Sequence, residues 1–82
     1  MAVDFEKLIK SIVTPLVMHP EDIVVKTIAE EENEITIQVL VSEEDLGRVI
    51  GKGGRIASAI RTIVYAGASK EGKRVRIDID AF

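Results

Sequence analysis

The chain has no cysteine and only three aromatic side chains, and these absences limit what it can be. Without cysteine it has neither disulfides nor a thiolate zinc site to support a chain of 82 residues, a size at which folding hides only about 60% of the unfolded surface. No apolar run reaches transmembrane length, and the acids Asp4 and Glu6 stand where a secretory signal would be basic. We therefore expect one cytoplasmic domain over residues 1–82, with no membrane insertion and a core of apolar packing alone.

Positive charge is scarce overall, since the net charge is −3, but it is concentrated in one half of the chain. Residues 1–45 contain eleven acids and three bases, whereas residues 46–82 contain eight bases and three acids. Binding to phosphates requires local positive potential, which only the second half offers. The alternative is that these bases merely belong to a mixed, solubilising surface.

The spacing of apolar residues predicts three helices and three strands in the order αββααβ. A short acidic turn makes the first two strands antiparallel, and the two helices before the last strand allow a parallel crossover. We expect Asp4 to cap the first helix, Ser42 to cap the second, and Gly67 to end the third. The predicted elements are a helix over 4–17, strands over 23–29 and 35–41, helices over 42–49 and 54–66, and a strand over 74–80.

The most informative segment is Gly51-Lys52-Gly53-Gly54, which falls between two predicted helices. A tight turn needs one glycine, whereas three of them around a lysine leave backbone N–H groups accessible to a phosphodiester. A Walker P-loop is excluded, because the glycine spacing is one residue short and Lys52 is not followed by Ser or Thr. A dinucleotide-binding loop would follow a strand, and here a helix precedes it. No nucleotide cofactor is therefore implied.

The run Val49-Ile50-Gly51-Lys52-Gly53-Gly54-Arg55-Ile56 resembles the signature of KH domains, which is an Ile before G-x-x-G and another shortly after it. The element order matches the type II form. The continuation through residues 56–65, the segment Thr14-Pro15-Leu16-Val17 and the short length resemble the small bacterial KhpA family of RNA-binding proteins. The resemblance covers essentially the whole chain. It implies an α+β fold, an α/β sandwich in which a three-stranded mixed sheet packs on helices.

The resemblance also implies a partner, single-stranded RNA, whose backbone the glycine loop clamps. Lys52 would add a point charge and Arg55 a donor fork near the same phosphates, with Arg48 as the next candidate. It further implies an RNA chaperone that pairs with the larger protein KhpB and affects cell shape and cell wall or envelope biogenesis. The expected RNA-binding residues are Gly51, Lys52, Gly53, Gly54, Arg55 and Arg48, with Ile50 and Ile56 as apolar neighbours. Whether Arg74 and Arg76 touch RNA stays open.

The three aromatic residues lie outside the loop and the second strand, so the predicted RNA site has no aromatic platform on which bases could stack. A single domain of this kind should bind RNA weakly and with little sequence preference. High affinity for RNA would then require a second domain, so we expect the protein to assemble. The helix over 54–66 has a broad apolar stripe, which predicts a homodimer or a heterodimer with KhpB, with Ile60 or Ile63 at the interface. The alternative is that both isoleucines are internal.

Two other functions compete with RNA binding. The chain could be a protein-interaction module for dimerisation, in which the glycine loop is vestigial. An enzyme is the weakest class, because the single histidine, His19, has no discernible base, nucleophile or metal partners in the sequence. We therefore expect no catalytic residues, no metal, no cofactor and no small-molecule substrate.

Overall fold

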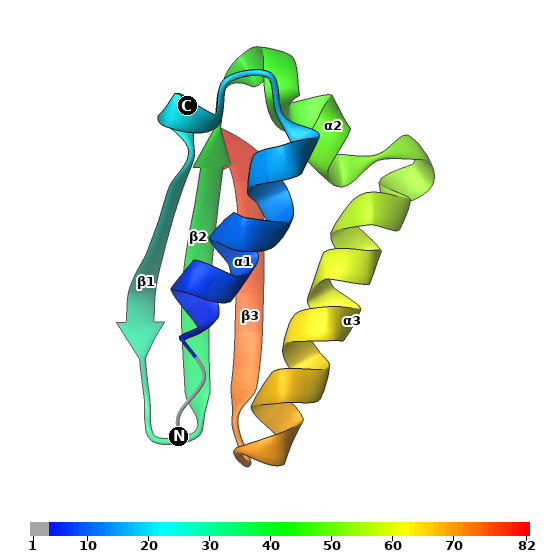
Figure 1. The fold of residues 1–82 in the computed structure, drawn as a ribbon. Helices are drawn as coiled ribbons and strands as arrows, with labels where there is room; N and C mark the ends of the chain where they lie inside the picture. The colour runs from blue at the N-terminus through cyan, green and yellow to red at the C-terminus, as the bar shows by residue number, and fades with distance from the viewer. Residues whose placement is uncertain (1–3) are drawn as a thin grey trace.

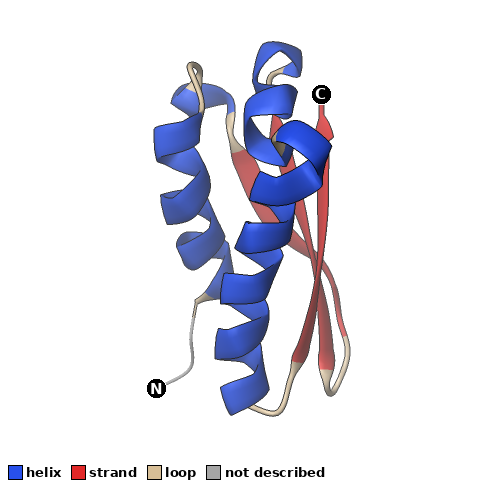
Figure 2. Ribbon diagram, turned by 90° about the vertical axis from the view of Figure 1, so that its right-hand side faces the viewer, coloured by secondary structure: helices blue, strands red, loops and turns tan. Residues whose placement is uncertain are grey.

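The computed structural model describes residues 4–82 and has two layers, with helices on one side and a sheet on the other (Figures 1 and 2). The order αββααβ is confirmed. In the described part of the chain, four short 3-10 turns supplement the main elements. The main elements are α1 (Phe5–Val13), β1 (Val24–Glu30), β2 (Glu34–Val41), α2 (Leu46–Ile50), α3 (Arg55–Lys70) and β3 (Arg74–Ala81).

The sheet is mixed, with strand order β1-β2-β3. β1 runs antiparallel to β2, with a shift in register between Thr27 and Ala29, and β3 runs parallel to β2. Because side chains alternate along a strand, every second residue of β2 is buried, and these residues lie on the face that α1 and α3 cover (Figure 2). Within residues 4–82, no helix lies over the other face of the sheet. The central position of β2 makes it the most buried strand.

The core lies between this sheet and the two long helices. α1 contributes Phe5, Ile9 and Val13 to the core, and α3 contributes Ala57, Ile60, Val64 and Ala68.

The side chain of Asp4 caps α1 as predicted, by accepting a hydrogen bond from the Lys7 N–H at 3.1 Å. No helix within residues 4–82 is long and apolar enough to cross a membrane.

Two predicted helix ends are wrong. α1 stops at Val13, and Pro15 lies in a separate 3-10 turn, because proline has no N–H to continue the α-helical bonding. α3 continues through Gly67 to Lys70, and the chain turns instead at Gly72, whose φ is +69°. Gly67 lies close to α1, since a Cβ at this position would be 3.8 Å from Cε1 of Phe5. An added Cβ would make only an ordinary contact at this distance, so neither helix packing nor helix termination requires a glycine here.

The broad apolar stripe on α3 is divided between core and surface. Ile60 is only 2% exposed and belongs to the core, so its assignment to an interface was wrong. Ile63 is 52% exposed, and Ala59 beside it is also exposed. Ile56 is half-buried against the core. One flank of the stripe therefore remains uncovered, as the width of the stripe predicted.

Candidate nucleic-acid interface

The loop between α2 and α3 requires its glycines for conformational reasons. Gly51, Gly53 and Gly54 have φ values of +77°, +65° and +77°, in the left-handed region that other residues rarely adopt. Gly51 is also crowded, because a Cβ there would lie 2.6 Å from Cγ1 and 2.9 Å from the backbone nitrogen of Ile56. A simple hinge with one glycine therefore does not describe this loop. Figure 1 shows it at one end of the molecule, where α2 meets α3.

The backbone of the loop has both satisfied and free donors. The Gly51 N–H bonds to the Gly47 carbonyl at 2.9 Å, and the Gly54 N–H bonds to the Gly51 carbonyl at 3.0 Å. The Arg55 N–H bonds to the carbonyl of Lys52. The N–H groups of Lys52 and Gly53 have no acceptor among residues 4–82. An anion can reach these two backbone donors, because Gly53 has no Cβ that would shield them.

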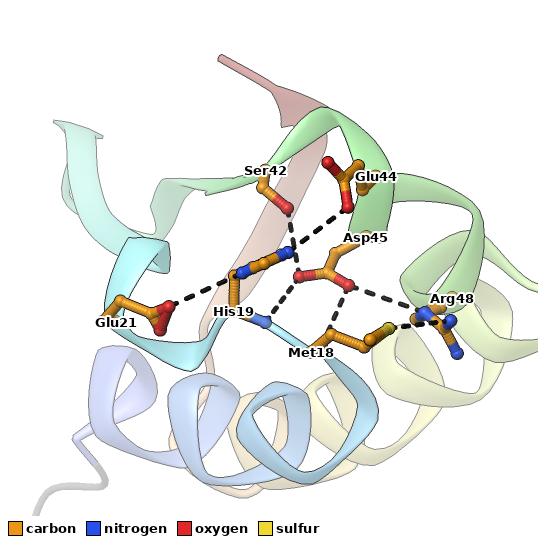
Figure 3. A network of polar contacts seen from close by, with 7 residues as sticks. All are labelled: Met18, His19, Glu21, Ser42, Glu44, Asp45 and Arg48. Carbon is orange, nitrogen blue, oxygen red and sulfur yellow. Dashed lines mark hydrogen bonds and ion pairs between the residues drawn. The ribbon is translucent and has the colours of Figure 1, made fainter.

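The basic side chains around the loop differ in how they are held. Lys52 and Arg55 are exposed and form no ion pair with any described residue. Arg48 is exposed but tethered, with Nε 3.6 Å from Oδ1 of Asp45 and Nη2 donating to Sδ of Met18 at 3.1 Å (Figure 3). Lys52 and Arg55 therefore carry the unpaired positive charge at the loop. Arg48, one turn earlier, is held by Asp45 and Met18.

The two apolar residues predicted beside the loop are both half-buried. Ile56 packs against the core and stands directly under Gly51. Ile50 ends α2 and is not among the side chains that pack on the core cluster. Ile50 is thus the better placed of the two to offer apolar area to a ligand.

Sequence reasoning missed the buried carboxylate of Asp45, which it treated as one of three acids favoured by the dipole of a helix. Asp45 is 0% exposed and accepts the N–H groups of Met18 and His19, each at 2.9 Å, and the hydroxyl of Ser42 at 3.1 Å (Figure 3). We predicted that Ser42 caps the backbone of the helix. Its hydroxyl instead donates a hydrogen bond to the Asp45 side chain. The Ser42-x-x-Asp45 spacing, which resembles a capping box, was the only signal.

The Asp45 carboxylate links the connection between α1 and β1 to the start of α2. Burial raises the pKa of Asp45, but the hydrogen bonds from Met18, His19 and Ser42, with the nearby charge of His19, outweigh burial and lower the pKa below its ordinary value. The network therefore favours the charged carboxylate. α2 and the glycine loop after it are thereby fixed against residues 18 and 19.

His19 has partners that the sequence did not reveal. Its Nε2 lies 3.4 Å from Glu44 and its Nδ1 lies 3.6 Å from Glu21 (Figure 3). The hydrogen bond to Glu44 raises the pKa of His19 most; burial opposes it, and the charges of Asp45, Glu44 and Glu21 add to the increase. Donor atoms of His19, Glu21 and Asp22 all lie within 4.8 Å of one another. Both acids are exposed and no further feature points to a cation, so we assign no metal to them.

The element order, the mixed three-stranded sheet and the glycine loop between α2 and α3 together define a KH domain of type II. Residues 6–79 match the family model described as KhpA/KhpB, KH domain. The chain belongs to this family. Membership also confirms the prediction that the chain is not an enzyme.

Proteins named RNA-binding protein KhpA are similar along most of their length. One from Listeria monocytogenes serovar 1/2a is 58% identical over 74 residues, which are 90% of this chain and 96% of that protein. One from Oceanobacillus iheyensis is 50% identical over 72 residues, 88% of this chain and 95% of that protein. One from Bacillus subtilis strain 168 is 48% identical over 75 residues, 90% of each.

The Asp45 network predicts an acid-dependent loss of stability. A depressed pKa contributes stability that is fully present above the unfolded-state pKa of about 3.8 and is lost as the pH falls through the lower folded-state pKa. Asp45→Asn should lower the melting temperature at neutral pH and flatten this acid limb of the stability curve. Glu43→Gln, an exposed acid of the same turn, is the control and should change neither. Thermal denaturation between pH 2 and 7 tests this, and equal profiles for the two variants would contradict it.

Proposed function

We propose that this chain binds single-stranded RNA, with the backbone of the strand held at the glycine loop. The observation that carries the proposal is the pair of unbonded N–H groups at Lys52 and Gly53. They lie in a loop in which three glycines have positive φ. KH loops of this kind clamp nucleic acid backbones. The names of the similar proteins support the same ligand.

Each residue of the site has a distinct role in this proposal. The Lys52 and Gly53 N–H groups donate to phosphate oxygens, while Gly51 and Gly54 give the loop its shape. Lys52 adds an ammonium charge and Arg55 a planar donor fork. Arg48, held at a fixed distance from Asp45, adds a third positive group. Ile50 and, to a smaller extent, Ile56 offer apolar area to a base.

We also propose a cellular setting, which rests on the family resemblance alone. In this setting the chain is a single KH domain in the cytoplasm, an RNA chaperone that acts with a KhpB-type partner. Its targets would affect cell shape and envelope homeostasis.

The exposed flank of α3 favours assembly and also supports the second candidate function, a dimerisation module. Ile63 is 52% exposed on the flank of α3 beside the buried stripe, and Ala59 extends the same apolar surface. We propose that this flank is the interface of a homodimer or of a heterodimer with KhpB. A pair of domains would raise the avidity of two weak RNA sites. If the loop were vestigial, this flank would be the only functional surface.

The double variant Lys52→Asp with Gly53→Asp should abolish RNA binding without unfolding the domain. Both positions are exposed, and acids at the clamp repel phosphate. Asp adopts a positive φ, as Gly53 requires, more readily than most other residues. The matched control is Lys10→Asp with Ser11→Asp, an exposed pair on α1 that makes the same change in charge. Fluorescence anisotropy of a labelled oligonucleotide measures affinity, and circular dichroism checks folding. Full affinity in a folded loop variant would refute the clamp.

The clamp alone should in addition contribute about −2 to the log–log salt slope of the unmodified protein, from roughly −0.7 for each of about three phosphates. A flat salt response would favour the dimerisation module.

Ile63→Asp should give a folded monomer, because the side chain is exposed and its replacement disrupts only an interface between chains. Ile60→Asp, at a site that is 2% exposed, should give an unfolded chain, since an unpaired carboxylate would be buried in the core. Light scattering with circular dichroism separates the two outcomes. If the unmodified protein is already a monomer at tens of micromolar, the homodimer is excluded and a pull-down with KhpB decides the heterodimer.

A further inference from the structure

A second basic site lies at the end of α3 farthest from the glycine loop. A cleft of about 770 Å³ opens there between the second half of α3, the turn from β1 to β2, and the start of β3. Its lining includes Tyr65, Ser69, Lys73, Arg74, Arg76 and one acid, Glu34. Figure 1 shows the glycine loop at one end of α3 and the turn into β3, which borders the cleft, at the other.

The charge of this cleft is available to a ligand. Lys73, Arg74 and Arg76 form no ion pair with any residue from 4 to 82, and Glu34 is the only opposing carboxylate in the lining. Three cations and one acid therefore line this cleft, and Lys73 also borders a neighbouring hollow that is lined by Asp4, Glu6, Glu30 and Glu71. No basic residue of the glycine loop contributes to the cleft, so the charge is additional to that of the clamp.

Tyr65 gives the cleft an aromatic surface. Its side chain is 45% exposed, and it is the only tyrosine in a chain without tryptophan. Sequence reasoning found no aromatic residue in the loop or on the second strand and concluded that stacking platforms were missing. The fold brings Tyr65 into one cleft with three cations, at a distance from the loop and from the second strand. An aromatic face beside phosphate-binding charges is the combination that single-strand binders use.

The flank of α3 between the two sites is polar and faces the free edge of the sheet. Arg61 and Tyr65 are four residues apart and therefore lie on one side of the helix. Arg61 reaches across to β3 and donates to the Ile77 carbonyl at 3.0 Å. β3 is an edge strand, so this carbonyl has no strand partner. A ligand that runs along this flank meets polar groups from one site to the other.

The spacing fits a short single strand. Arg55 and Tyr65 are ten residues apart, which is about 15 Å along a helix axis. A nucleic acid strand rises about 3.4 Å per stacked nucleotide and more when extended, so roughly two to four steps cover this distance.

We propose that Tyr65, with Lys73, Arg74 and Arg76, forms a second contact for the RNA strand that the glycine loop clamps. A nucleobase stacks on the Tyr65 ring, and the adjoining phosphates pair with the three cations. This inference rests on the proposed function and adds to it a stacking platform and a minimum length of RNA. An oligonucleotide of about four nucleotides fills only the clamp, whereas one of about eight reaches both sites.

The second contact is compatible with the proposed dimer. At 3.6 residues per turn, Ile63 and Tyr65 are about 160° apart around the helix axis. They therefore lie on opposite flanks of the buried stripe, and one helix can present each of them to a different partner.

Intrinsic fluorescence tests the inference directly, because all tyrosine emission comes from Tyr65. We expect octauridylate (U8) to quench this emission along the same curve as the anisotropy of labelled U8, after correction for absorption with free tyrosinamide. Tetrauridylate (U4) should bind more weakly and quench less. If U8 binds by anisotropy while the emission of Tyr65 stays unchanged, the second contact is refuted and the clamp stands. If U8 does not bind at all, both proposals fail.

Variants provide an independent check. Tyr65→Leu should weaken U8 binding by about fivefold or more, whereas Tyr65→Phe, which keeps the ring, should stay close to the unmodified protein. Arg74→Gln with Arg76→Gln should reduce the magnitude of the salt slope by about 1.4, or about 0.7 per lost contact. Lys7→Gln with Lys10→Gln, an exposed pair on α1, is the matched control and should leave the slope unchanged. Equal slopes for the two pairs, or equal affinities for Leu and Phe, would overturn the assignment.

Discussion

The position of the glycine loop depends on one buried carboxylate. α2 is only five residues long, far too short to be stable by itself, so its place must come from tertiary contacts. Val49 anchors it to the core, and Asp45 anchors its start by accepting two backbone N–H groups and one hydroxyl from outside the helix. A hydrogen-bonded anion that is fully buried holds its surroundings strongly, because any lost partner leaves charge unsatisfied. The same carboxylate also tethers Arg48 beside the loop.

From this anchor the chain enters α3, which serves three purposes on three sides. Its buried stripe completes the core through Ile60 and Val64. One flank exposes Ile63, and the other presents Arg61 and Tyr65 to the edge of β3.

The charged residues of the two halves of the sequence lie on different elements of the fold. The acidic first half supplies α1, β1 and β2, whereas the basic second half supplies the loop, α3 and the first part of β3. A protein with a net negative charge thereby retains a positive surface.

Local signals were enough to predict the element order and the position of the glycine loop between two helices. The alternation in β2, the helical spacing in α1 and the density of glycine at 51–54 each depend on nearby residues only. Long-range contacts could not be predicted. Gly67 resembles a helix terminator in the sequence, but α3 continues to Lys70 and the chain turns at Gly72. Asp45 resembles a surface acid until residues 18 and 19 fold onto it. Ile60 and Ile63 belong to one stripe in the sequence, and only the packing of α3 on the core decides that Ile60 is covered and Ile63 is exposed.

The central claim is that the free N–H groups of Lys52 and Gly53 hold the RNA backbone, and amide chemical shifts report on these groups individually. In a titration of the isotope-labelled protein with U8, the account predicts that the amide resonances of Lys52 and Gly53 shift most, while those of the Ile63 flank of α3 move little. Unchanged resonances at Lys52 and Gly53, at RNA concentrations that saturate binding, would contradict the account.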